Sequence, residues 1–124
     1  MKAIGYSVFG TAKDVLKSIN IPIPTPTSGQ VLVRLIRSGV NPSDVKARAG
    51  ARPGITKPAF ETVIPHSDGS GIIEAVGDGI DPHRVGERVW VWNGQWQRAY
   101  GTAADYIALD ATQAVPMPDE MSFD

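Results

Sequence analysis

Hydrophobic and polar residues alternate along much of the chain, and this period of two predicts β-strands. The alternation is regular over residues 1–9 and continues over residues 15–23. Residues 31–36 are apolar on nearly both faces, which favours a strand inside a sheet. Further short strands are expected over residues 68–77, 89–92, 103–109 and 114–117. The pattern therefore predicts about seven closely spaced strands.

Prolines and glycines indicate how these strands can pair. Pro22, Pro24 and Pro26 each lack a backbone donor, so we expect this stretch at the edge of a sheet. Asn93-Gly94 is a strong signal for a tight hairpin. The glycines within residues 68–77 predict a bulge, a sharp bend or the close approach of another backbone.

One segment changes from strand chemistry to helix chemistry. Asn41 suits the N-cap of a helix, Pro42 suits the first helical position, and Asp44 places negative charge near the free backbone amides. Gly50 can end the helix in a left-handed conformation. We therefore expect a helix of about two turns. Residues 51–65 contain three prolines and no periodicity, which indicates a surface loop.

These elements describe a small, mostly-β domain built as an antiparallel barrel with long loops and one short helix. The length of 124 residues suits a single domain with its own core. Glycine and proline, 13 and 10 residues, make up about a fifth of the chain, and this share favours many turns rather than disorder.

Composition excludes several classes of function. The formal charge of −1 gives no reason to expect a nucleic-acid partner. No apolar run approaches the roughly 20 residues that span a bilayer, and the first residues lack a signal-peptide pattern, so we expect no membrane partner and a cytoplasmic location. The absence of cysteine excludes a disulfide scaffold, a thiol nucleophile and cysteine-ligated zinc.

Several familiar catalytic motifs are missing. Gly69-Ser70-Gly71 begins like a dinucleotide fingerprint, but Glu74 stands where the third glycine would fall. There is no Walker loop and no nucleophile elbow. His66 and His83 are the two histidines, and their separation does not suit a shared metal site. These motifs therefore give no set of residues by which this chain alone would catalyse a reaction.

An ordered series of motifs nevertheless spans the chain. It resembles the medium-chain dehydrogenase/reductase superfamily, and most closely its zinc-independent, zeta-crystallin-like quinone oxidoreductase branch. The motifs are Gly39-Val40-Asn41-Pro42-Ser43-Asp44, residues 65–77, Val85-Gly86-Glu87-Arg88-Val89, Ala104-Asp105-Tyr106-Ile107 and Val115-Pro116-Met117-Pro118.

The resemblance implies a GroES-like, partly open β-barrel with one or two short helices over residues 1–124. It also implies that a Rossmann domain, which binds NADPH, follows in such proteins and is missing from this chain. Residues 121–124 agree, because they read like the start of a further helix. The chain is therefore expected to be the N-terminal, substrate-side part of a longer protein.

The resemblance further implies hydride transfer from NADPH to a quinone or an activated enone. Zinc-binding members of the superfamily have cysteine where Asn41 stands and a His-Glu pair where Ser67-Asp68 stands, so no zinc is expected. The predicted cofactor-binding residues lie along the cleft of such proteins and are Asn41, Pro42, Ser43, Asp44 and Lys46. No residue is assigned a catalytic role, and none is assigned to a metal.

Simpler interpretations of these residues stay open. Asn41 is also explained as a helix cap alone, and Lys46 as a solvated lysine where many relatives have tyrosine. Asp44 suits a charge partner for the helix amides.

Three functional hypotheses follow. The first is the N-terminal domain of an NADPH:quinone oxidoreductase that takes a small-molecule quinone or enone, with the isolated chain inactive and a homodimer as the candidate assembly of the full-length form. The second is the corresponding part of a zinc-free alkenal or enoyl reductase. The third is a non-enzymatic GroES-like interaction module, for which residues 51–65 are the candidate partner-binding loop.

Overall fold

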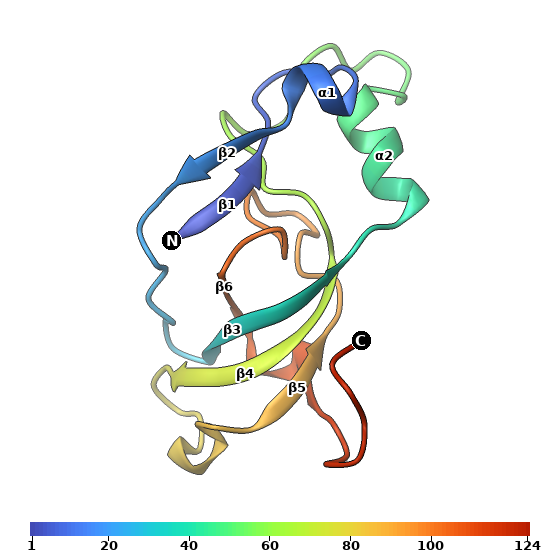
Figure 1. Cartoon of the computed structure of the whole chain (residues 1–124). Coiled ribbons are helices and arrows are strands. Elements are labelled where there is room, and N and C mark those ends of the chain that lie inside the picture. Colours follow the sequence, from blue (N-terminus) through green and yellow to red (C-terminus); the bar gives the residue numbers. More distant parts are fainter.

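The computed structural model describes residues 1–124 and confirms a mostly-β fold (Figure 1). Two 3-10 turns, η1 (Pro82–Arg84) and η2 (Ala111–Gln113), join the later strands. Neither α-helix is long and apolar enough to cross a membrane. The other elements are β1 (Lys2–Gly5), α1 (Ala12–Val15), β2 (Lys17–Asn20), β3 (Gln30–Gly39), α2 (Pro42–Ala49), β4 (Asp68–Val76), β5 (Arg88–Val91), β6 (Tyr106–Asp110) and β7 (Ala114–Pro116).

The strands form two antiparallel sheets. β1 pairs with β2, and the larger sheet has the order β6-β3-β4-β5-β7. An isolated bridge connects Ala3 of β1 to Ala104, just before β6, and the two sheets do not close into a full barrel. The expected partly open barrel is therefore confirmed. Both helices lie together at the end of the molecule that holds β1 and β2, away from β4 and β5 (Figure 1).

The β3–β4 pair is the longest in the structure, and it bends. Its register shifts between Leu32 and Val33 and again between Leu35 and Arg37. Beside the second shift the two backbones come so close that a Cβ added at Gly71 would lie 2.1 Å from the carbonyl oxygen of Arg34. The prediction that glycines in this strand permit a bulge and a close backbone approach is confirmed.

The main core fills the concave side of the larger sheet. Alternate residues of the strands point inward, as the period of two requires. Val31 and Val33 of β3 and Leu109 of β6 are fully buried. The complete cluster is Val31, Val33, Ile73, Val89, Val91, Ile107, Leu109 and Ala114.

A smaller core attaches α1 and the first strand to the rest of the domain. It consists of Tyr6, Val15 and Val63, with Phe9 and Leu16 packed against it. Tyr6 exchanges backbone hydrogen bonds with Val63, of 2.9 and 2.8 Å. This pairing connects the end of the first strand to the end of the loop over residues 51–65.

The expected helix over residues 42–49 is confirmed as α2. Asn41 is its N-cap, and the Asp44 carboxylate accepts a hydrogen bond from the backbone N–H of Asn41 at 2.7 Å. Gly50 ends the helix with a left-handed φ of 75°. Because all of these contacts lie within a few residues, local sequence is sufficient to predict the helix.

Two strand predictions near the N-terminus were too long. β1 ends at Gly5 rather than at residue 9, and Tyr6 forms only an isolated bridge. The strand predicted over residues 15–23 is β2, which spans only Lys17–Asn20, and Val15 is the last residue of α1 instead of the first of the strand. The backbone N–H of Val15 donates to the Thr11 carbonyl at 3.1 Å, and the Thr11 hydroxyl donates to Asp14 at 2.8 Å. These local hydrogen bonds, with burial of Val15 in the smaller core, override the alternating pattern. The proline-rich residues 22–26 follow β2 without forming a strand at a sheet edge, because pairing ends at Asn20.

The hairpin predicted at Asn93-Gly94 is wrong. β5 is already paired on both sides, with β4 and with β7, so the chain after residue 92 has no free edge to return to. Asn93 does adopt a positive φ of 51°, as a turn residue can. Gly94 is instead buried, and its N–H donates to the Ser67 carbonyl at 2.8 Å. The turn is thus the start of a long loop between β5 and β6.

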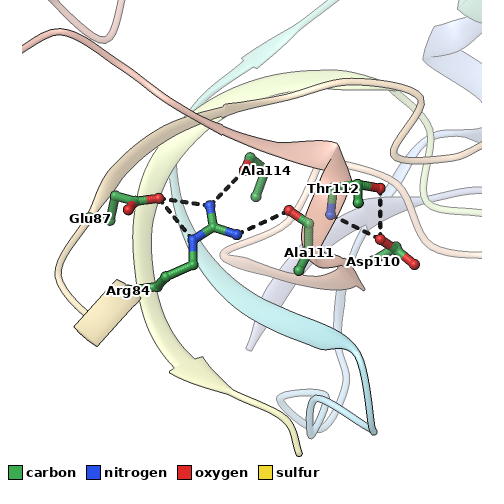
Figure 2. Close-up of polar contacts among 6 residues, drawn as sticks. All are labelled: Arg84, Glu87, Asp110, Ala111, Thr112 and Ala114. Atoms are coloured by element: carbon green, nitrogen blue, oxygen red, sulfur yellow. Dashed lines mark hydrogen bonds and ion pairs between the residues drawn. The ribbon is translucent and has the colours of Figure 1, made fainter. Parts of the chain in front are cut away.

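Arg84 joins η1 to the last part of the larger sheet (Figure 2). Its guanidinium donates to Glu87 at 2.7 and 3.0 Å and to the carbonyl oxygens of Ala111 and Ala114 at 3.1 and 2.7 Å. Next to these contacts, Asp110 accepts from the backbone N–H and the hydroxyl of Thr112 at 2.9 and 2.7 Å. These hydrogen bonds lower the pKa of the Asp110 carboxyl, since they favour its charged form.

Replacing Gly71 by alanine is expected to destabilise the domain, because the new methyl group would overlap the backbone of Arg34. We expect a loss of about 1–3 kcal/mol in the free energy of unfolding, as for other overpacked sites. Urea denaturation of G71A measures it. G39A is the matched control, since its Cβ would meet nothing closer than 3.4 Å. Equal stability of the two variants would show that β4 does not need the close approach.

The pKa of Asp110 is expected to lie below its ordinary value of 3.8. Because the folded-state pKa is lowered, the stabilisation from this carboxylate is present at neutral pH and is lost as the pH falls through that pKa. Carboxyl-detected NMR titration measures the midpoint. T112V removes the hydroxyl donor and keeps the backbone donor, so it should return the midpoint part of the way towards 3.8. A wild-type midpoint at or above 3.8 would contradict the assignment.

Candidate functional site

A cavity of about 570 Å³ opens at the end of the domain that holds α2. Its wall comes from five parts of the chain: the segment after β1, α2 with Gly50, residues 52–63, Ser67 and residues 93–98. Residues 51–65, expected as a surface loop, are thus partly a wall of this cavity. The long loop found in place of the predicted hairpin supplies residues 93–98 of the wall.

Apolar and aromatic side chains form much of the cavity wall. Phe9, Phe60 and Trp96 line it together with Ile55 and Val63. Trp96 is 64% exposed, so an uncovered aromatic face borders the opening. Such a surface suits a flat, carbon-rich molecule of small size.

Only some of the predicted cofactor-binding residues reach this cavity. Ser43 and Asp44 line it, whereas Asn41, Pro42 and Lys46 are not part of its wall. Pro42 occupies the start of α2. Lys46 is exposed, and its backbone carbonyl accepts from the N–H of Ala51. The role of the five residues in cofactor binding stays a prediction.

Asn41 is placed between α2 and the start of β4. Its side-chain amide donates to the Asp68 carboxylate at 2.5 Å, while its backbone N–H donates to Asp44. Asn41 is therefore an N-cap and also a side-chain bridge to Asp68. Ser67, which precedes Asp68 and stands where zinc-binding members of the superfamily have histidine, lines the cavity.

A chain of hydrogen bonds holds the segment just before β4. The Ser38 hydroxyl lies 2.9 Å from His66 Nδ1 and 3.0 Å from the Thr102 hydroxyl. Thr102 is fully buried and donates to the Asp68 carbonyl at 2.7 Å. His66 has a positive φ of 79°, which places it where bulky residues are uncommon. The network fixes Ser67 and Asp68 between β3 and residue 102.

The structure contains no group of three or more histidine, cysteine, aspartate or glutamate side chains placed to hold a metal ion. His66 Nδ1 faces Ser38, and the Asp68 carboxylate faces Asn41. The polar side chains around this site therefore form hydrogen bonds with one another.

Two ionisable residues in the cavity wall have shifted pKa values, and sequence reasoning missed both. Burial lowers the pKa of Arg98, whose guanidinium donates to the Ala108 carbonyl. Burial raises the pKa of the Tyr6 phenol, Arg48 opposes this effect, and Asp44 adds to it. Tyr6 had only the pattern of an ordinary strand residue, and Arg98 lay in a segment without periodicity. No local signal distinguished either residue.

Comparison with known proteins identifies the class of this domain. Residues 27–119 match the family described as the alcohol dehydrogenase GroES-like domain. The chain belongs to this family. The fold expected from the resemblance, a GroES-like partial barrel, is the one observed.

Curated relatives connect the chain to quinone oxidoreductases. The quinone oxidoreductase of Rattus norvegicus is 32% identical over 123 residues, which cover 99% of this chain and 35% of that protein. The Danio rerio synaptic vesicle membrane protein VAT-1 homolog is 35% identical over 125 residues, which cover 99% of this chain and 24% of that protein. The chain thus spans about a third or less of the length of these relatives. The resemblance to the quinone oxidoreductase branch is confirmed.

Solved structures agree on the fold. The putative NADPH:quinone reductase of Bacillus thuringiensis superimposes with a TM-score of 0.83 at 32% identity, covering 98% of this chain and 34% of that one. A mycobacterial protein in complex with NADPH has a TM-score of 0.82 at 27% identity, covering 99% of this chain and 35% of that one.

Replacing Thr102 by valine is expected to lower the free energy of unfolding by about 1–3 kcal/mol, because the Asp68 carbonyl loses a buried donor without a replacement. T102S is the matched control: it keeps the hydroxyl and loses one methyl group, worth about 0.8 kcal/mol. Denaturant unfolding should therefore rank T102V below T102S. The reverse order would show that packing, and not the hydrogen-bond network, holds this segment.

Proposed function

We propose that this chain is the substrate-side domain of an NADPH-dependent reductase that transfers a hydride to a quinone or an activated enone. The observation that carries the proposal is the cavity, whose aromatic and apolar wall meets the polar first turn of α2. Relatives and structural neighbours named as quinone oxidoreductases support the same acceptor class. A cavity of about 570 Å³ accommodates a one- or two-ring carbonyl compound.

The residues present suit the nicotinamide end of the cofactor better than its phosphates. The segment from Asn41 to Lys46 offers amide, hydroxyl and ammonium groups, and Ser43 and Asp44 of this segment border the cavity. No strand–glycine loop–helix unit for a pyrophosphate occurs in this antiparallel topology. When bound, NADPH supplies the hydride, while these residues orient its reactive ring and keep water from the acceptor. The phosphates are assigned to a further domain, the Rossmann domain that the family resemblance implies.

The proposed reaction does not use zinc. The positions occupied by metal ligands in zinc-binding members of the superfamily hold Asn41, Ser67 and Asp68, and Asn41 is hydrogen-bonded to Asp68. An amide and a hydroxyl are poor substitutes for a thiolate and an imidazole as zinc ligands. A quinone or enone needs less electrophilic assistance than a simple ketone, because its conjugated system spreads the developing charge.

We expect the 124-residue chain by itself to leave NADPH unoxidised in the presence of 1,4-benzoquinone, because it lacks a phosphate-binding fold. A longer protein that joins this domain to a dinucleotide-binding domain should turn over at rates typical of enzymes, about 1–10³ s⁻¹. Absorbance of NADPH measures both.

Treatment of this longer protein with a chelator is the control for metal, and it should leave the rate unchanged. A comparison of quinone with alkenal and enoyl acceptors decides between the two reductase hypotheses. Reductase-like turnover by the short chain, or loss of activity with the chelator, would contradict the proposal.

A further inference from the structure

Tyr6 stands out among the polar side chains of the cavity wall. It is 6% exposed, whereas the other polar residues that line the cavity are half-buried or exposed. Its ring packs with Val15 and Val63 in the smaller core, and its backbone is paired with Val63. The position of the ring is therefore set by the fold rather than by solvent.

The Tyr6 hydroxyl has no hydrogen-bond partner within the chain. The structure also contains no fully buried side-chain nitrogen or oxygen without a partner. Together these two facts mean that the hydroxyl reaches accessible space, although the rest of the residue is covered. A phenol in this position leaves its hydrogen-bonding capacity for a bound molecule.

The hydroxyl is assigned to the larger cavity rather than to the neighbouring one. Tyr6 also lines a second cavity of about 360 Å³, on the side of β2. However, the charged groups that affect the Tyr6 phenol are Asp44 and Arg48, which both lie on α2. Asp44 lines the larger cavity and not the second one.

Two half-buried donors in the wall of the larger cavity, Arg98 and Gln95, are already engaged, and most of the remaining side-chain donors of the wall are exposed to solvent. Arg98 donates to the Ala108 carbonyl, and the amide of Gln95 donates to the Arg98 carbonyl at 3.0 Å. Asp44 is an acceptor when ionised and is held by the N–H of Asn41. Tyr6 thus combines burial, a fixed ring and a free donor. Burial also keeps the phenol protonated, because it raises its pKa.

We propose that the Tyr6 hydroxyl is the donor that binds the carbonyl oxygen of the acceptor in the larger cavity and so selects carbonyl compounds over hydrocarbons of the same shape. The proposal rests on the proposed function, which places the acceptor in this cavity. The carbonyl oxygen is the atom that gains negative charge when a conjugated acceptor accepts a hydride. The hydrogen bond from a preorganised donor to that oxygen, in a mostly apolar cavity, therefore becomes stronger as reduction proceeds.

The test compares two ligands that differ only at the carbonyl. Acetophenone and ethylbenzene have nearly the same size, and acetophenone without cofactor is not consumed. Both are titrated into the 124-residue chain, and the affinities are obtained from amide NMR shifts of residues in the cavity wall. In Y6F we expect acetophenone to bind roughly three- to tenfold more weakly than in the wild type, the range for one lost hydrogen bond. Ethylbenzene should bind to both proteins within about twofold.

Y100F is the matched control, because Tyr100 lines only the second cavity and is 41% exposed. It should leave both affinities unchanged. Equal weakening of both ligands in Y6F would indicate a packing role and overturn the proposal. Unchanged acetophenone binding in Y6F, with both ligands bound in the cavity, would also overturn it and leave the proposed function intact. Failure of the wild type to bind either ligand in this cavity would overturn both.

Discussion

The close approach between β3 and β4 is the constraint on which both the core and the site depend. Gly71 permits β4 to pass directly beside the backbone of Arg34. At one end of this pair, Val33 lies opposite Ile73 inside the main core. At the other end, Gly39 pairs with Asp68, which brings the residues that enter α2 beside the start of β4. The register shifts along the pair bend the ladder.

Polar groups at the site are mostly satisfied by one another, and this gives the site its rigidity. Ser38, His66 and Thr102 form one chain of hydrogen bonds, while Asn41 joins α2 to Asp68. A network of this kind orders the backbone without offering many free donors to a ligand. The few groups left over then determine what the cavity can recognise. In a wall made largely of aromatic and aliphatic side chains, each such group has a large effect on specificity.

Local chemistry explains which sequence predictions succeeded. α2 was predictable because Asn41, Asp44 and Gly50 act within their own turns of chain. The central strand at β3 was predictable because its residues are apolar on both faces. The predictions failed where distant contacts compete with local ones. Val15 ends a helix although the alternating pattern begins there, and Asn93 cannot open a hairpin because β5 has partners on both sides.

The sequence by itself determined the mostly-β class, the capped helix and the ordered motifs that identify the family, since each depends on residues close together or on their order. It also singled out Asn41, which proved to join α2 to Asp68. Only the tertiary structure decided which side chains share the cavity. A period of two tells which face of a strand is buried, but not what lies opposite that face. Tyr6, Trp96 and Asp44 meet there because residues 52–63 and 93–98 lie against α2 and the segment after β1, and no local pattern encodes that meeting.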